Sequence, residues 1–222
     1  MNTRHGGPGG RQETIRLRTA AGRSPASQRW LARQLNDPYI PAAKAAGWRS
    51  RAAFKLLELD DRFRLVRPGA RVVDLGAAPG GWTQVALARG AGRVVGIDLL
   101  AMIPVPGAHL IAGDFHDPAC AALLAELLGG PADLVLSDMA PNTTGHAATD
   151  HTRIMALAEE ALAFALDVLA PGGGFVAKLL QGGAERAMLA TLKARFAAVR
   201  HAKPPASRRE SREVYLVATG RR

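Results

Sequence analysis

The sequence predicts an α/β fold in which a mostly parallel sheet is covered by helices on both faces. Short runs of Val, Ile and Leu alternate along the chain with longer segments whose apolar residues recur at helical spacing. Four of the short runs end in an aspartate. Such alternation is typical of a parallel sheet, because parallel neighbours need a crossover that a helix usually supplies. The 222 residues can hold one domain of this class with a sizeable core.

A glycine-rich turn follows the first predicted strand. Residues 72–75 read Val-Val-Asp-Leu, the turn reads Gly-Ala-Ala-Pro-Gly-Gly, and Trp82 lies in a helix expected over about 81–89. This arrangement of strand, turn and helix N-terminus binds nucleotide-like cofactors, since glycine lets the backbone approach a ligand closely. The glycine spacing does not match the G-x-G-x-x-G of a dinucleotide site, which disfavours an NAD-dependent enzyme. An ordinary tight turn of an α/β domain is the simpler alternative.

Carboxylates follow the predicted strands at one edge of the sheet. The four that we expect to gather there are Asp74, Asp98, Asp114 and Asp138. Such an edge suits a cationic, hydroxyl-rich ligand better than a pyrophosphate, and S-adenosylmethionine is the natural candidate. Asp98 stands 18 residues after Gly80, where folds of this kind bind a ribose. We expect Asp74 to order the glycine-rich turn rather than to touch the ligand.

The chain divides into a basic arm and a single domain. Residues 1–28 are polar and rich in Gly and Arg, and we expect them to be disordered. Residues 29–222 are expected to form the domain. It begins with a helical segment over 29–63, in which Ser50 is a candidate N-cap for the part that ends at Phe63. Further helices are expected over 117–128, 151–169 and 183–196, and a further strand over 175–180.

The charge of the chain favours a polyanionic partner. The net charge is +10 and the isoelectric point is about 10.9. Residues 1–34 carry seven Arg against one Glu, and residues 193–222 carry nine Lys or Arg against two Glu. We expect both ends to hold a phosphate backbone, although a solubilising tail is an alternative for the first 34 residues. Contact with RNA is expected above all from Arg208, Arg209 and Arg212.

Neither a membrane span nor a disulfide is predicted. No run of 18 apolar residues is present, and the single Cys120 cannot form a disulfide within the chain. The Arg-rich, acid-poor N-terminus leaves a mitochondrial transit peptide as an alternative. The glycines and the proline between Gly6 and Gly10 disfavour an amphipathic helix there. We therefore expect a cytoplasmic bacterial protein.

Several segments in register resemble the FtsJ/RrmJ (RlmE) family of ribosomal RNA methyltransferases. They are the turn over 74–82, the Ser-Asp-Met-Ala-Pro-Asn of 137–142, Lys178 with Gln181-Gly182, the Ser-Arg-Glu-Val-Tyr of 211–215 and the upstream segment 50–56. The resemblance covers about residues 38–220. It implies a Rossmann-like S-adenosylmethionine-dependent methyltransferase whose mostly parallel seven-stranded sheet ends in an antiparallel hairpin, around 199–203 and 214–219. We expect the protein to be a monomer. It also implies methylation of a ribose 2′-hydroxyl, which in bacterial members belongs to a uridine in the A-loop of 23S ribosomal RNA in the assembled 50S subunit.

The resemblance also implies a catalytic set, formed by Lys55, Asp138, Lys178 and Glu213. Lys178 would accept the proton of the hydroxyl and Asp138 would orient it, while Lys55 and Glu213 would complete the network and hold the ribose. The ordinary pKa of a lysine is about 10.4, so a protonated Lys178 that only positions the oxygen is an alternative. The cofactor-binding residues implied in the same way are Gly80, Trp82, Asp98, Asp114 and Asp138.

Individual roles follow for some of these residues. Asp98 would bind the ribose hydroxyls of the cofactor and Asp114 its adenine amino group, whereas Trp82 is also consistent with a core aromatic. His146 and His151 lack metal-ligand spacing, so we expect them to be solvated and the protein to bind no metal.

Two departures from the family pattern concern the segment beside Lys178. Gly-Gly-Ala at 182–184 stands in place of Gly-Glu-Gly, and Leu-Leu at 179–180 in place of Val-Phe. They put the conformation of the loop in question rather than the chemistry.

Two other classes were weighed against ribose methylation. A methyltransferase acting on base amines would carry Asn or Asp followed by Pro-Pro and an aromatic residue, but residues 138–141 read Asp-Met-Ala-Pro. A catalytically silent, S-adenosylmethionine-binding ribosome assembly factor or RNA chaperone stays open. Such a protein would lose nothing when Lys178 is changed, whereas the enzyme would lose its product.

Overall fold

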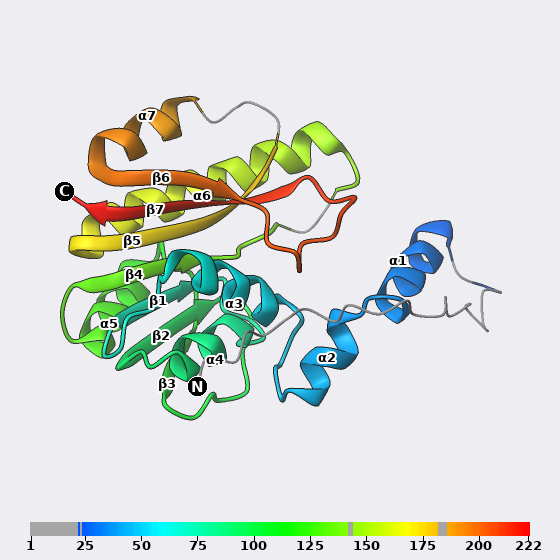
Figure 1. The fold of residues 1–222 in the computed structure, drawn as a ribbon, viewed down its shortest axis with the longest axis horizontal. Helices are drawn as coiled ribbons and strands as arrows, with labels where there is room; N and C mark the ends of the chain where they lie inside the picture. Colours follow the sequence, from blue (N-terminus) through cyan, green and yellow to red (C-terminus); the bar gives the residue numbers. More distant parts are fainter. Residues whose placement is uncertain (1–21, 23, 142–143, 182–185) are drawn as a thin grey trace.

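The computed structural model describes residues 22, 24–141, 144–181 and 186–222 (Figure 1). Helices and strands alternate through most of the described chain, as the sequence predicts. In chain order the elements are α1 (Pro25–Leu35), α2 (Tyr39–Ala45), α3 (Ala52–Phe63), β1 (Arg71–Leu75), α4 (Gly81–Ala88), β2 (Arg93–Asp98), β3 (Ala108–Ala112), α5 (Pro118–Leu128), β4 (Ala132–Ser137), α6 (Ala147–Val168), β5 (Leu169–Leu180), α7 (Arg186–Arg195), β6 (Phe196–Ala202) and β7 (Glu213–Arg221).

The strands form one seven-stranded sheet in the order β3-β2-β1-β4-β5-β7-β6. The first five strands of this order pair in parallel, and β7 pairs antiparallel with both β5 and β6. The mostly parallel Rossmann-like sheet with a C-terminal antiparallel hairpin is thereby confirmed. Strand order reverses between β1 and β4, and in open α/β sheets ligands bind beyond the carboxyl ends of the strands at such a switch point.

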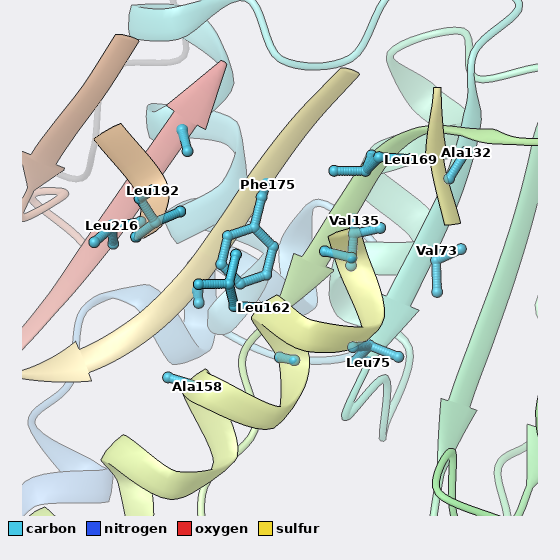
Figure 2. Packing of buried hydrophobic residues seen from close by; sticks show 14 of the residues in the cluster. Val73, Leu75, Ala132, Val135, Ala158, Leu162, Leu169, Phe175, Leu192 and Leu216 are labelled. Carbon is cyan, nitrogen blue, oxygen red and sulfur yellow. The ribbon is translucent and has the colours of Figure 1, made fainter. Parts of the chain in front are cut away.

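Two apolar layers cover the sheet, one on each face. Successive side chains of a strand point to opposite faces, so Val73 belongs to the layer that includes residues of α5, α6 and α7, while Val72 belongs to the layer that includes residues of α3 and α4. Figure 2 shows the first layer, where Leu162 of α6 lies against Phe175 of β5. The helical face predicted within 151–169 is buried there, which confirms it as a core face.

The N-terminal part differs from the continuous helical segment expected over 29–63. It contains three helices, and α1 begins at Pro25, inside the segment 1–28 that was expected to be disordered. The rest of that segment lies outside the described residues. The prediction that Ser50 caps α3 was wrong. Arg51 is the N-cap and makes no side-chain capping hydrogen bond, while Ser50 Oγ lies buried against Gly81.

Two further boundaries differ from the predicted ones. β5 begins at Leu169 rather than at residue 175, because Leu169 already pairs with Ala132 before an irregularity in the ladder. α6 begins at Ala147, four residues before the expected start, where the ring of His146 accepts a hydrogen bond from Thr149 N. No helix within the described part of the chain is long and apolar enough to cross a membrane.

Candidate active site

A cavity of about 490 Å³ opens at the carboxyl ends of β1, β2 and β4. Its size lies in the range of sites for small ligands and cofactors. Three of the four predicted edge carboxylates, those of Asp98, Asp114 and Asp138, line it, whereas Asp74 does not. The other lining residues are Gly76, Ala78, Ile97, Leu99, Leu100, Gly113, Phe115, His116, Met139, Ala140, Pro141 and Leu157.

The glycine-rich turn forms one wall of this cavity. Gly76 has a φ of +73°, and a Cβ added to it would lie 2.6 Å from Met139 Cγ. A larger residue would therefore need both a strained backbone and a displaced neighbour. Asp98 fastens the turn to β2, since its Oδ2 accepts a hydrogen bond from Ala78 N at 2.9 Å and its Oδ1 one from Leu100 N at 2.9 Å.

Asp74 lies fully buried under the turn. Its Oδ2 accepts a hydrogen bond from Thr83 Oγ1 at 2.7 Å, whereas no partner is present for Oδ1 among the described residues. Burial raises the pKa of Asp74 to about 7, and the negative charges of Asp138 and Asp98 act in the same direction, against the Thr83 hydrogen bond. The contact with Thr83 of α4 agrees with the predicted role of Asp74 in ordering the turn.

Asp114 shares its carboxylate with a residue that the sequence did not single out. Its Oδ1 accepts a hydrogen bond from His116 N at 3.0 Å and lies 2.7 Å from His116 Nδ1. The backbone and ring of His116 lower the pKa of Asp114. His116 Nε2 lies 3.4 Å from Glu160 Oε2 on α6, and its ring lies against Phe115 at 3.9 Å between centroids. An adenine amino group at Asp114 would therefore bind beside His116.

Neither Gly80 nor Trp82 lines the cavity. Trp82 is 3% exposed, its Nε1 donates a hydrogen bond to Ala52 O at 2.8 Å, and it belongs to the layer under α3 and α4. A Cβ on Gly80 would lie 3.0 Å from Val105 Cγ2 and 3.1 Å from an Arg49 guanidinium nitrogen. Of the two readings of Trp82, these contacts favour the core aromatic.

The four residues of the predicted catalytic set meet beside the cavity, although they come from α3, β5, β7 and the loop that follows β4. Lys178 Nζ lies 3.1 Å from Asp138 Oδ1 and donates a hydrogen bond to the Asp138 carbonyl at 2.6 Å. Lys55 Nζ donates to Glu213 Oε2 at 2.9 Å and lies 3.8 Å from Asp138 Oδ2. Both lysines are buried. Asp138 belongs to this set and also lines the cavity, so it joins the two halves of the site.

Tyr215 connects Lys55 to Asp138 at the centre of this set. Its hydroxyl donates a hydrogen bond to Asp138 Oδ1 at 2.6 Å and accepts one from Lys55 Nζ at 3.0 Å. Burial, and then the charges of Asp138 and Glu213, raise the pKa of Tyr215 well above its ordinary value, so it stays a donor at neutral pH. Sequence reasoning missed it as a site residue. The available signal was its place two residues after Glu213, which puts both side chains on one face of a strand.

The charge of Asp138 is stabilised by its neighbours. Burial by itself would raise the pKa of Asp138, but the ammonium groups of Lys178 and Lys55 and the hydrogen bond from Tyr215 outweigh burial and lower it. Asp138 is therefore ionised at neutral pH, as an orienting partner for Lys178 requires.

The basic residues expected to contact RNA lie around the loop between β6 and β7. The guanidinium group of Arg208 binds Asp37, and that of Arg212 donates to Gln181 O, whereas Arg209 is exposed. A groove runs between this loop and the corner of α1 and α2, where Arg51 and Lys203 also line it.

The remaining predictions concern the histidines and the loop after β5. His146 is exposed, as predicted, but the expectation for His151 was wrong, because both its ring nitrogens are buried without a partner in the described structure. The described residues contain no group of three His, Cys, Asp or Glu side chains arranged to hold a metal. The departure at 182–184 lies outside the described residues.

Comparisons with known proteins agree with this geometry. The family model of FtsJ-like methyltransferases matches residues 48–221. The chain is 66% identical to "Ribosomal RNA large subunit methyltransferase E" of Gluconobacter oxydans over 95% of its own length and 78% of the relative. It is 68% identical to the protein of that name from Granulibacter bethesdensis, with 96% and 92% covered. A Plasmodium falciparum crystal structure, assigned as a ribosomal RNA methyltransferase, superimposes with a TM-score of 0.71 at 30% identity, covering 78% of this chain and 98% of the other.

Proposed function

Because the chain belongs to the FtsJ-like methyltransferase family, we propose that it transfers a methyl group from S-adenosylmethionine to ribosomal RNA. The acceptor is the 2′-hydroxyl of a ribose, in a uridine of the A-loop of 23S ribosomal RNA within the assembled 50S subunit. The protein acts as a cytoplasmic monomer. The observation that carries the proposal is the buried set of Lys55, Asp138, Lys178 and Glu213 at the edge of a carboxylate-lined cavity.

The cavity fits S-adenosylmethionine by its charge and by its walls. Asp98 offers carboxylate oxygens to ribose hydroxyls, and Asp138 places a negative charge where a cationic ligand would bind. Leu99, Leu100 and Met139 provide apolar surface for a purine ring. The glycine-rich turn at Gly76 leaves no room for a Cβ, as a wall that a ligand approaches closely requires. Bound there, S-adenosylmethionine supplies an electrophilic methyl group on a sulfonium.

The residues of the set align the acceptor and take its proton. Asp138 lines the cavity and lies 3.1 Å from Lys178 Nζ, which supports placing the reacting hydroxyl next to this lysine. The oxygen of the hydroxyl gains the methyl group as the methyl–sulfur bond breaks and leaves a neutral thioether. The proton of the hydroxyl passes to Lys178 Nζ, which accepts it as the neutral amine. Lys55 and Glu213 hold the ribose, with Tyr215 bridging Lys55 to Asp138. Alignment in such a site contributes several kcal/mol, and proton transfer contributes about 10²–10⁴-fold.

The choice of ribosomal RNA rests on the relatives' names and on the basic surface near Glu213. Two relatives that share about two thirds of their residues with this chain are named as large-subunit ribosomal RNA methyltransferases. Arg209 is exposed on the loop that precedes β7, where it can neutralise phosphates of a bound strand. A base-amine methyltransferase would lack a use for the buried Lys178.

The test is transfer of labelled methyl from S-adenosylmethionine to unmodified 50S subunits, followed by identification of the modified nucleoside. Wild type is compared with Lys178→Ala and with Lys44→Ala, which removes an exposed lysine of α2. We expect 2′-O-methyluridine from wild type and Lys44→Ala, and none from Lys178→Ala. Cofactor binding without label in any of the three would instead support a silent assembly factor. A labelled base would contradict ribose as the acceptor.

A further inference from the structure

The carboxylate of Glu213 is held at both of its oxygens. Lys55 Nζ donates to Oε2 at 2.9 Å, and the hydroxyl of Ser207 donates to Oε1 at 2.7 Å. Ser207 is 4% exposed and lies in the loop between β6 and β7, six residues before Glu213. Its backbone is turned back by a hydrogen bond from Ser207 N to Pro204 O at 2.8 Å. The hydroxyl is thus fixed in a buried position where it contacts the carboxylate and not the cavity.

The residues on either side of this serine are fastened to the N-terminal helices. Ala206 N donates a hydrogen bond to Glu58 Oε2 at 2.7 Å, and the Arg51 guanidinium donates to Ala206 O. Arg208 donates from Nε and a terminal nitrogen to Asp37 Oδ2, at 3.2 and 3.1 Å. Asp37 is 6% exposed, and its Oδ2 also lies 2.9 Å from Arg51 Nε. These two groups form an ion pair, but their geometry is not that of a hydrogen bond. The loop is therefore held on both sides of residue 207.

Fixing both oxygens matters because of what each contact restrains. A single contact to Lys55 leaves the carboxylate free to rotate about its own bonds, while a second donor selects one orientation. Hydrogen bonds to charged groups are worth roughly twice those between neutral groups. With Oε1 held by Ser207, Glu213 Oε2 faces Lys55, and Lys55 in turn keeps its contact with Tyr215. Ser207 thus acts on the catalytic set through Glu213.

We propose that Ser207 is a positioning residue for Glu213, and that the Asp37–Arg208 ion pair keeps Ser207 in place. This inference rests on the proposed function, because it gives Glu213 a part in the methyl transfer. It adds a residue from a loop outside the segments that carry the family resemblance. It also ties the corner between α1 and α2, about 170 residues away in sequence, to the geometry of the catalytic set.

The first experiment measures single-turnover methyl transfer to 50S subunits at saturating S-adenosylmethionine and RNA. Ser207→Ala is expected to lower the rate about 10- to 100-fold, the effect of losing a hydrogen bond to a charged group. S-adenosylmethionine affinity is expected to change less than twofold. Ser207→Thr, which keeps the hydroxyl, should recover most of the rate. Thr191→Ala is the matched control, since it removes a hydroxyl that only donates to a backbone carbonyl within α7.

A double-mutant cycle separates positioning from a general structural effect. If Ser207 acts through Glu213, Ser207→Ala has no further effect on the residual rate of a Glu213→Ala variant, whereas independent losses multiply. Asp37→Asn is expected to give a smaller loss that also disappears with Glu213→Ala. Multiplying losses, or failure of Ser207→Thr to recover the rate while the variant stays folded, would overturn the inference. A wild-type rate in Ser207→Ala overturns this inference alone, while a wild-type protein that transfers no methyl group overturns the proposed function with it.

Discussion

The buried carboxyl group of Asp74 makes the stability of the fold depend on pH in a way that one substitution can isolate. In the folded protein burial raises the pKa of Asp74 to about 7, from an ordinary value of 3.8. Between these values the folded chain holds a proton that the unfolded chain has lost. The stabilisation of the folded state relative to the unfolded state is thus present below about pH 4 and is lost as the pH rises towards 7. A shift of this size corresponds to about 4 kcal/mol.

Asp74→Asn removes the charge and keeps the shape of the side chain. The amide oxygen can still accept the hydrogen bond from Thr83 Oγ1, and the amide nitrogen takes the place of Oδ1, which already has no partner among the described residues. The cost of the unpaired group is nearly independent of pH. The difference in free energy of unfolding between Asp74→Asn and wild type should therefore shift in favour of the variant by about 4 kcal/mol between pH 4 and pH 8.

The assay is urea unfolding of both proteins at four or five pH values, without cofactor. Asp167→Asn serves as the control, because Asp167 is an exposed aspartate on α6 and the substitution removes a carboxylate from the surface rather than from the interior. We compare the urea midpoint of Asp74→Asn with that of wild type at each pH. This difference should favour the variant more at pH 7 and above than at pH 5. A difference that stays the same within 1 kcal/mol from pH 5 to pH 8 would refute the reasoning, since Asp74 would then titrate alike in both states.

Three further predictions concern the site itself. Tyr215→Phe should fold, and its rate of single-turnover methyl transfer should fall about 10- to 100-fold with unchanged cofactor affinity, because the bridge between Lys55 and Asp138 is removed. Equal rates for Tyr215→Phe and wild type would show that the bridge is dispensable. Gly76→Ala should lower both thermal stability and S-adenosylmethionine affinity in calorimetry, since its Cβ would clash with Met139 and its φ is positive. Unchanged affinity would contradict the proposal that the turn forms a closely fitting wall of the cofactor site. Arg209→Ala should reduce the slope of log affinity for RNA against log salt by about 0.7–0.9, the effect of one phosphate contact; an unchanged slope would remove Arg209 from the interface.

Sequence reasoning predicted the sheet because its signals are local. Strand runs such as 72–75 and 94–98 are short, apolar and followed by turn residues, and each lies in a strand of the structure. The antiparallel hairpin and the catalytic set came from the resemblance, because residues as far apart as Lys55 and Glu213 carry no periodic signal that joins them. The structure brings those two within 2.9 Å.

The missed residues share a physical cause. The roles of Tyr215, His116 and Ser207 come from the partners that folding brings to them, which lie far away in sequence or are set by the local turn. Ser50 was misread for the opposite reason. A serine before an apolar helical segment fits a cap by propensity, but tertiary packing against the glycine-rich turn places its hydroxyl beside Gly81.

The register of three strands explains why a sheet of this kind can assemble the site. Ser137 pairs with Ala177 in the parallel ladder, so Asp138, one residue on, stands beside Lys178, and Lys178 pairs directly with Tyr215 across the antiparallel ladder. Asp138, Lys178 and Tyr215 thus form one row across β4, β5 and β7, on the face where α3 supplies Lys55. A shift of β7 by one residue would turn Tyr215 and Glu213 to the opposite face, which α6 and α7 cover. The pairing of the C-terminal hairpin with β5 is therefore a condition for assembling the proposed catalytic set as well as for closing the sheet.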